Sequence, residues 1–262
     1  MRIICPVKRV PDTAADKKMN ADGTLDRDSA EAVLNANDEW AIEEALRIRE
    51  RGADAELIVL CVGPEAAATT IRKALSYGLD GAIHVTDDAI KGSDAAGIAR
   101  VIAAALRAEE FDLVIMGNQS SDARTMLVPA MLAELLDVPA LTYAKALSVD
   151  GRTIRVDRET PTGHQTVEAQ LPAVVSVVEA INQPRYPSFK GIMAAKSKPV
   201  TTKSLADIGL DAGEVGLDNA WTQVLDVTPR APKTAGQRVH DDGSGTVGAK
   251  ALADFLAARK LI

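Results

Sequence analysis

The sequence predicts an α/β protein built on a mostly parallel sheet. Three observations indicate this class: apolar runs of strand length recur up to residue 178, helical stripes of apolar residues lie between the first of them, and several runs end at glycine. Strands that alternate with helices favour parallel pairing with right-handed crossovers. A near-continuous apolar run such as Glu56–Val62 is typical of a strand that is covered on both faces.

The elements of the first half follow from apolar periodicity and from residues that begin and end helices. We expect strands at 2–8, 56–62, 82–86 and 113–116. We expect helices at 38–51, from Pro64 to Gly78, after Ser93 or Asp94, and from about 125 to 136. Asn35 or Asn37 can cap the first helix. The polar stretch 11–29 predicts a long loop or a small hairpin.

The pattern changes in the second half. We expect a strand at 139–147, a hairpin of strands 153–160 and 165–171, and a buried strand at 173–178. Beyond residue 183 only 249–261 regains a helical stripe, and prolines interrupt the tail, namely Pro184, Pro187, Pro199, Pro229 and Pro232. The tail should therefore lie on this chain's own domain or on another protein. The predicted fold is a Rossmann-like three-layer sandwich with a mostly parallel sheet, an added antiparallel hairpin and an extended C-terminal arm.

Composition excludes several classes of protein. The 262 residues are 47% hydrophobic, which is typical of a protein with a core and not of a disordered chain. No apolar run reaches the roughly 20 residues of a membrane helix, and the start lacks a signal peptide's apolar stretch. Two cysteines provide no disulfide framework, so we expect a cytoplasmic protein without membrane insertion. A net charge of −7 argues against nucleic-acid binding.

Polar loops follow three predicted strands and form the candidate ligand site. They lie at 6–9, 62–64 and 117–125. In open parallel sheets, ligands bind beyond the carboxyl ends of the strands, and a helix N-terminus supplies free N–H groups for a phosphate. The run Gly117-Asn118-Gln119-Ser120-Ser121-Asp122 can approach a ligand through its glycine and can bond an adenine edge or ribose. These features favour a nucleotide pocket, with ordinary polar loops as the alternative.

Catalytic and metal-binding patterns are absent from the sequence. His84, His164 and His240 are scattered along the chain, and Cys5 and Cys61 indicate buried thiols or, as the alternative, a redox pair. Residues 243–248 match G-x-G-x-x-G, but no strand precedes them, so we interpret them as a flexible turn. We therefore expect no enzymatic activity of the chain's own.

Several motifs in order resemble one family, the beta subunit of electron transfer flavoprotein, over nearly the whole chain. These motifs are Val7-Lys8-Arg9-Val10-Pro11-Asp12, Asn35-x-x-Asp38-Glu39, Ile71-Arg72-x-Ala74-Leu75-x-x-Gly78, Gly117-x-Gln119-x-x-Asp122, Leu171-Pro172-Ala173-Val174-Val175, Pro184-Arg185-Tyr186 and Gly191-Ile192-Met193. The hairpin departs from the family pattern, with Pro161-Thr162-Gly163 where many members have Asp-Gly-Gly.

The resemblance implies a heterodimer with an alpha subunit that holds or shares the redox-active FAD, while this subunit binds AMP structurally. It implies electron transport from acyl-CoA and related dehydrogenases, as in fatty acid beta-oxidation, to a membrane quinone oxidoreductase. It also implies two parts: an α/β nucleotide-binding domain at 1–183, and a recognition loop with a C-terminal arm at 184–262 that packs on the partner subunit. The alternative is a stand-alone adenine-nucleotide-binding stress or signalling protein, which would not need such a long tail.

Carried over by position, the AMP pocket comprises residues from four segments. They are Pro6, Asn35, Ala36, Asn37, Asp38, Val62, Gly117, Asn118, Gln119, Ser120, Ser121, Asp122, Ala123, Arg124, Thr125, Met126, Leu127 and Val128. Where well-known members have polar Asn-Gln-Thr, this chain has Met126-Leu127-Val128. Backbone N–H groups, Arg124 or Thr125 would then contact the phosphate. Some members place a second FAD in this pocket instead of AMP.

The resemblance also implies two contact regions. Glu159 matches a family glutamate near the flavin and the subunit boundary. The recognition loop that docks on the dehydrogenase comprises Arg185, Tyr186, Phe189 and Lys190, with Phe189 as the apolar anchor. Nearby lysines would steer an acidic partner, namely Lys190, Lys196, Lys198 and Lys203.

Overall fold

The computed structural model describes residues 1–228, 231 and 235–262. The chain divides into two compact units, Met1–Leu225 and Asp226–Ile262. Pro229 and Pro232, which the sequence places in an irregular tail, lie outside the described residues. No helix among the described residues is long and apolar enough to span a membrane.

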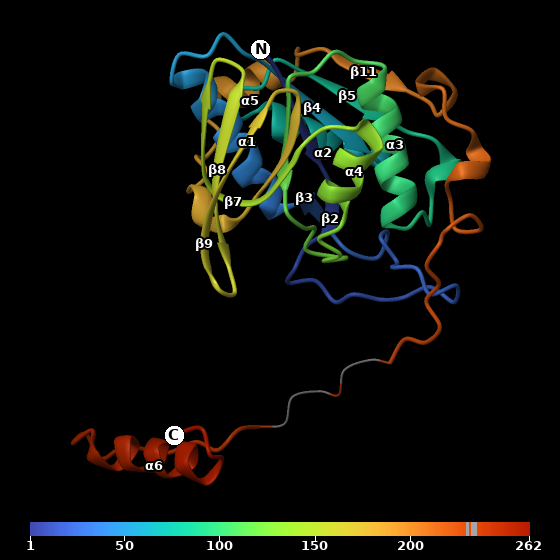
Figure 1. Cartoon of the computed structure of the whole chain (residues 1–262). Coiled ribbons are helices and arrows are strands. Elements are labelled where there is room, and N and C mark those ends of the chain that lie inside the picture. The colour runs from blue at the N-terminus through green and yellow to red at the C-terminus, as the bar shows by residue number, and fades with distance from the viewer. Residues whose placement is uncertain (229–230, 232–234) are drawn as a thin grey trace. The chain divides into compact units, whose positions relative to one another are not determined.

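The first unit is built around one large sheet (Figure 1). Within the described residues, nine strands pair in the order β11-β5-β4-β1-β6-β10-β7-β8-β9. Their bounds are β1 Arg2–Val7, β4 Glu56–Val62, β5 Gly81–Val85, β6 Leu113–Gly117, β7 Ala140–Asp150, β8 Thr153–Thr160, β9 Gly163–Gln170, β10 Ala173–Val177 and β11 Val200–Lys203. All neighbouring pairs are parallel except β7–β8 and β8–β9, and β8–β9 is the predicted hairpin.

Helices cover both faces of this sheet, which confirms the predicted three-layer sandwich. Their bounds are α1 Ala36–Glu50, α2 Ala68–Leu75, α3 Ala95–Arg107, α4 Val128–Leu136 and α5 Phe189–Ala195. Short 3-10 turns lie at Glu65–Ala67, Asp88–Ile90, Glu179–Ile181, Ala206–Ile208 and Ala212–Glu214. Apolar residues of α1, α2 and α5 pack in one core cluster, and those of α3 and α4 pack in the other.

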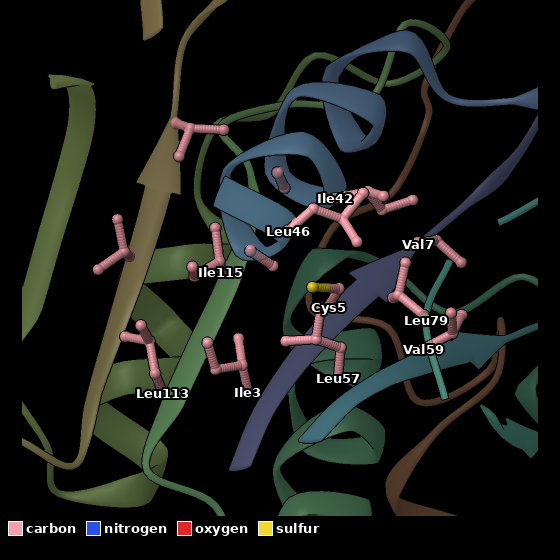
Figure 2. Packing of buried hydrophobic residues seen from close by; sticks show 14 of the residues in the cluster. Ile3, Cys5, Val7, Ile42, Leu46, Leu57, Val59, Leu79, Leu113 and Ile115 are labelled. Carbon is pink, nitrogen blue, oxygen red and sulfur yellow. The ribbon is translucent and has the colours of Figure 1, made fainter. Parts of the chain in front are cut away.

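The side chains of strand β1 do not alternate between apolar and polar, because both faces of the strand are covered. Ile3 and Cys5 contribute to the first cluster, where Figure 2 shows them near Ile42 and Leu46 of α1. Ile4, the residue between them, contributes to the second cluster. Because successive side chains of a strand point to opposite faces, a strand with helices on both sides must be apolar at every position. This confirms the interpretation of the apolar runs as buried parallel strands.

The predicted elements are confirmed with small shifts at their ends, except for one helix start. The fourth helix was expected from about residue 125, but α4 begins at Val128. Met126 has φ 58° and Arg124 has φ 51°, and a left-handed residue cannot continue a right-handed helix. Pro129, in the first turn of α4, suits a helix start.

Four short elements have no counterpart in the sequence prediction. Strands β2, Arg9–Pro11, and β3, Ala32–Leu34, pair antiparallel at the two ends of the polar loop 12–31. Within that loop, Met19 and Leu25 form an isolated antiparallel bridge, so the expected small hairpin is present. Helix α5 and strand β11 lie in the tail that was expected to be irregular.

Strand β11 places part of the tail in the main sheet. It pairs in parallel with β5, from Val200 opposite Ala82 to Lys203 opposite Val85. The buried residues Leu205, Ile208 and Val215 then join the second core cluster. The boundary between the two compact units therefore falls after Leu225, whereas the sequence placed a boundary at 183/184. Packing of the arm on a partner subunit stays a prediction.

The second unit contains one helix, α6, at Thr246–Ala258. The helix begins three residues before the start of the predicted range 249–261, and it ends three residues before the end of that range. No side chain of α6 is buried, and Leu252 and Phe255 are among its exposed apolar residues.

Candidate functional site

The candidate site lies where the sheet reverses its winding direction. From β1 the chain passes to β4 and β5 on one side, then crosses to β6 on the other side of β1. In doubly wound sheets, ligands bind at this switch point, beyond the carboxyl ends of the strands. Lys8 directly follows β1, and residues 118–127 follow β6. The sequence-predicted loops are therefore brought to the expected edge of the sheet.

The start of α1 binds the loop that follows β6. Asn35 occupies the N-cap position, but its side chain does not cap the helix. Instead its Nδ2 donates to Gln119 O over 3.0 Å, and Asn37 Nδ2 donates to the same oxygen over 2.7 Å. Asn35 Oδ1 accepts from the N–H of Ser121 at 3.1 Å. The predicted segments Asn35–Asp38 and Gly117–Asp122 therefore form one hydrogen-bonded cluster.

Asp38 connects the end of β1, the start of α1 and the end of β6 inside this cluster. Its Oδ2 accepts from the backbone N–H of Lys8 at 2.8 Å, and its Oδ1 accepts from Asn35 Nδ2 at 2.9 Å. Burial raises the pKa of Asp38 to about 7, although the hydrogen bonds from Lys8, Asn35 and Gly117 oppose the shift. The protein thus holds an ionisable group with a near-neutral pKa beneath the candidate pocket.

Gly117 is needed for helix packing, while its expected role in ligand approach stays a prediction. A Cβ built at Gly117 would lie 2.7 Å from the carbonyl carbon and Cβ of Asn37 and 2.7 Å from Asp38 Oδ1. A backbone carbon cannot yield as a flexible side-chain end can. The missing side chain therefore lets the first turn of α1 contact the end of β6 directly.

Asp122 is committed to internal ion pairs. Lys8 Nζ contacts its Oδ1 at 2.9 Å, and Arg27 contacts its Oδ2 at 2.7 Å, while the side chain is only 1% exposed. Burial alone would raise the pKa of Asp122, but the charge of Lys8 and the hydrogen bonds from Ser120, Lys8 and Arg27 outweigh it and hold the pKa far below its ordinary value. Asp122 therefore organises the loop through these ion pairs. The sequence had suggested a different role for Asp122, as an acceptor for ligand hydroxyls.

The part of the loop that faces solvent is 123–127. Among the described residues, five non-glycine residues have left-handed φ; two of them, Asp137 and Lys260, follow helix ends, and the other three are Arg124, Met126 and Tyr143. Tyr143 lies at a bulge of β7, and its hydroxyl is 3.5 Å from Met126 Sδ. Strained backbone of this kind clusters at functional sites. No side chain caps the N-terminus of α4, which leaves its first N–H groups for an anion.

Gln119 offers a further polar group in the cluster. Its Oε1 is buried without a hydrogen-bond partner among the described residues. Buried acceptors are normally paired, and a ribose hydroxyl or an adenine amino group would satisfy this one. The residues present therefore fit a nucleotide, with the phosphate at the start of α4.

Two other predicted pocket residues lie at the neighbouring strand ends. Pro6 is buried in β1, opposite Leu60 of β4. Val62 is half-buried at the end of β4. Both belong to strands adjacent to the switch point, so all predicted pocket segments share one edge of the sheet. Arg27 was missed, because nothing in the polar stretch 11–29 distinguishes it from its neighbours.

The backbone N–H groups of all three glycines in the G-x-G-x-x-G motif at 243–248 donate to a side chain of the same chain. Asp241 Oδ1 accepts from the N–H groups of Gly243 and Gly245, each at 2.8 Å, and its Oδ2 accepts from Gly248 at 2.8 Å. The backbone donors that would hold a phosphate in a true dinucleotide loop are occupied. The motif therefore begins α6 and is not a phosphate site.

The two cysteines are buried free thiols. Burial raises the pKa of Cys5 and of Cys61 to about 12 in each case, and the nearby Asp38 charge adds to the shift. A thiol with such a pKa stays protonated and is a poor nucleophile. The structure therefore favours the structural interpretation over the redox pair.

The residues predicted to contact partners lie on the surface. Glu159 is 67% exposed, and its Oε1 contacts Lys145 Nζ of this same chain at 2.8 Å. Tyr186 is 94% exposed and Phe189 is 80% exposed, while Lys190 is also exposed.

Arg185 differs from these neighbours because its side chain binds α1. It contacts Glu43 at 2.8 Å and Glu50 at 2.5 Å.

Comparison with known proteins identifies the family of the chain. A family model described as electron transfer flavoprotein domain matches residues 22–208. The electron transfer flavoprotein subunit beta of Mycobacterium leprae (strain TN) is 48% identical over 266 residues, which cover 99% of each chain. The protein of the same name from Bradyrhizobium diazoefficiens is 35% identical, over 92% of this chain and 94% of that one. The caffeyl-CoA reductase-Etf complex subunit CarD of Acetobacterium woodii is 34% identical over 86% of each.

These matches define the class of the protein as a flavoprotein electron carrier with a doubly wound α/β fold. The chain belongs to the electron transfer flavoprotein family, in its beta-subunit branch. The resemblance identified in the sequence is thereby confirmed.

We predict that Gly117→Ala destabilises the protein by about 1–3 kcal/mol, because the added methyl overlaps the first turn of α1. Gly63→Ala is the matched control at the end of β4, where the new Cβ would meet only the Cβ of Ala67, at 3.3 Å. Urea unfolding of both variants measures the difference. Equal stability of Gly117→Ala and the wild type would contradict the close packing described above.

We predict that Asp38 makes stability depend on pH in a defined direction. Its folded pKa, about 7, lies above its ordinary value of 3.8, so the folded state binds the proton more tightly. Its contribution is full below pH 3.8 and is lost as pH rises through about 7.

Unfolding free energies of wild type and Asp38→Asn, measured from pH 4.5 to 8, should therefore converge or cross in favour of the variant as pH rises. Asp122→Asn is the control, because its lowered pKa moves its effect below this window. A parallel pH dependence for wild type and Asp38→Asn would show that Asp38 does not titrate as described.

Proposed function

We propose that this chain is the beta subunit of a heterodimeric, cytoplasmic electron transfer flavoprotein that binds AMP and helps an alpha subunit hold FAD. Electrons would pass from acyl-CoA and related dehydrogenases to the quinone pool through a membrane quinone oxidoreductase, as in fatty acid beta-oxidation. FAD, when bound, supplies the redox chemistry, and this chain supplies binding and docking surfaces. The observation that carries the proposal is the full-length 48% identity to a curated beta subunit.

The proposed AMP site uses the loop after β6. The uncapped start of α4 and Arg124 would bind the phosphate, because Met126 and Leu127 offer no polar side chain there. Gln119 and the strand ends around Pro6 and Val62 would surround the adenosine. A second FAD in the same pocket is the alternative occupant.

We propose Glu159 as a contact with a basic group of the alpha subunit near the flavin. Its carboxylate projects from the hairpin and is mostly exposed. In the single chain, Lys145 forms an ion pair with this carboxylate, and the hydrogen bond from Lys145 lowers the pKa of Glu159. A cation from the partner would compete with Lys145 or share the carboxylate. Ion pairs between solvent-exposed groups exchange readily because solvent and salt screen them.

We propose Tyr186 and Phe189 as the docking anchors for the dehydrogenase. Both aromatics are exposed, and Ile192 and Met193 extend the apolar surface along α5. Aromatic anchors of this kind dominate binding energy at interfaces. Of the four lysines expected to steer an acidic partner, Lys190 and Lys196 are exposed. Lys203 instead pairs with Glu109 at 2.7 Å, and Lys198 donates to Leu79 O.

The function is tested by producing the chain with and without an alpha subunit and measuring mass, flavin and nucleotide. We expect a heterodimer with FAD and one AMP released on denaturation, and Arg124→Gln should lower the AMP retained. Two FAD per heterodimer would instead favour the alternative occupant. A chain that stays alone and binds adenine nucleotide without any flavin partner would favour the stand-alone stress or signalling protein.

We predict that Phe189→Ala slows reduction of the heterodimer by an acyl-CoA dehydrogenase by roughly tenfold or more, as expected for a hot spot worth about 2 kcal/mol. Flavin and AMP content should be unchanged, because α5 packs against α2 and the side chain of Phe189 is exposed to solvent. Met19→Ala, which truncates an exposed apolar residue in loop 12–31, is the control. Wild-type rates at all dehydrogenase concentrations would remove Phe189 from the docking site.

A further inference from the structure

Helix α5 turns its apolar side toward solvent. Phe189, Ile192 and Met193 are all exposed, and Ala195 is the one buried residue of the helix. A surface helix is normally held in place by burying its apolar stripe, and a helix of only seven residues is not stable alone. The forces that fix α5 must therefore come from contacts other than apolar burial.

Arg72 supplies the contacts at the C-terminal end of α5. It extends from α2, and its Nη1 donates to Ala195 O and to Lys198 O, each over 2.7 Å. The carbonyls at the end of a helix lack partners within the helix, and a guanidinium satisfies them while also matching the negative end of the helix dipole. Lys198 in turn donates to Leu79 O, which continues the attachment toward β11.

The N-terminal half of α5 lies equally close to the body of the protein. Ser188 Oγ accepts from the N–H of Gly191 at 3.0 Å and caps the helix. Any side chain at Gly191 would overlap the carbonyl oxygen of Ser76, so α5 contacts the end of α2 backbone to backbone. Before the helix, Arg185 binds Glu43, whose side chain is buried. Polar contacts therefore hold both ends of α5, and Phe189, Ile192 and Met193 are exposed among the residues that the structure describes.

We infer that Arg72 is a positioning residue for partner docking: it holds α5 in the pose in which Phe189, Ile192 and Met193 present one preformed apolar surface. The partner that fits such a surface has an apolar groove for a short helix. This inference rests on the proposed docking role of α5, and it adds a residue that does not itself touch the partner. A preformed surface binds more tightly because less conformational entropy is lost on association.

The inference predicts a specific kinetic signature. Loss of positioning weakens the encounter without changing flavin chemistry, so KM for the heterodimer should rise while kcat stays near its wild-type value. Arg72→Gln removes the charge and shortens the side chain that extends from α2 to the two carbonyls. Arg72→Lys keeps a cation that can donate to both, and should largely restore the wild-type behaviour. Ser188→Ala removes only the cap of α5 and is a milder second variant.

The experiment uses the FAD-loaded heterodimer and two readouts: steady-state reduction by an acyl-CoA dehydrogenase, and hydrogen exchange of backbone amides 190–198. Arg100→Gln is the matched control, because Arg100 also donates to a backbone carbonyl, that of Glu214, but from α3 on the opposite face of the sheet. For Arg72→Gln we expect KM to rise roughly five- to tenfold and exchange in α5 to accelerate, with FAD content unchanged. Ser188→Ala should change both readouts in the same direction.

Parallel measurement of Phe189→Ala separates this inference from the proposed function. If Phe189→Ala raises KM but Arg72→Gln changes neither KM nor exchange, docking by α5 stands and the positioning role of Arg72 is wrong. If Phe189→Ala has no effect, the docking role itself is wrong, and the inference on Arg72 falls with it. If Arg72→Gln does not fold, then Arg72→Lys and Ser188→Ala decide, and wild-type values for Ser188→Ala would overturn the inference.

Discussion

The close contact between the first turn of α1 and the end of β6 is the constraint on which the site depends. The packing around Gly117 leaves no space for a side chain at that position. Asp38 lies buried in the same contact, and its carboxylate accepts a hydrogen bond from the backbone N–H of Lys8, directly after β1. One carboxylate thereby links β1, α1 and β6 at the switch point of the sheet. Because Asn35 and Asn37 extend the contact to Gln119, the position of the whole loop after β6 follows from it.

The ion pairs of Asp122 fix the remainder of that loop. Lys8 and Arg27 both bind it, so the polar loop 12–31 and the loop after β6 are joined at one buried carboxylate. A buried carboxylate that lost these partners would be costly, which makes the arrangement strongly preferred. With Asp122 turned inward, the solvent-facing surface of the loop consists of residues 123–127 and the start of α4. In the proposed AMP site, a phosphate there would be bound by backbone N–H groups and Arg124, and less by side-chain hydroxyls or amides.

Helix α5 differs from a core helix in how it is held in place. Its larger apolar side chains face solvent, and polar groups of Arg72, Ser188 and Arg185 hold the segment. If α5 docks on a partner as proposed, stability and recognition use different groups, because the exposed Phe189 contributes little to the fold of the free chain. The proposed nucleotide loop and the proposed docking helix are different elements, so variants can test them independently.

The sequence by itself determined the sandwich, because every strand buried between two helical layers must be apolar throughout, and that pattern is local. It also determined the candidate site through glycine, asparagine and aspartate at strand ends. Strand β11 and helix α5 were decided only by tertiary structure: Val200–Lys203 is half exposed and carries no periodic pattern, and the apolar side of α5 faces outward. The partners of Asp122 and of Arg72 lie about a hundred residues away in the chain. Local periodicity records which side chains are buried, whereas such long-range polar contacts arise only once the sheet has brought the segments together.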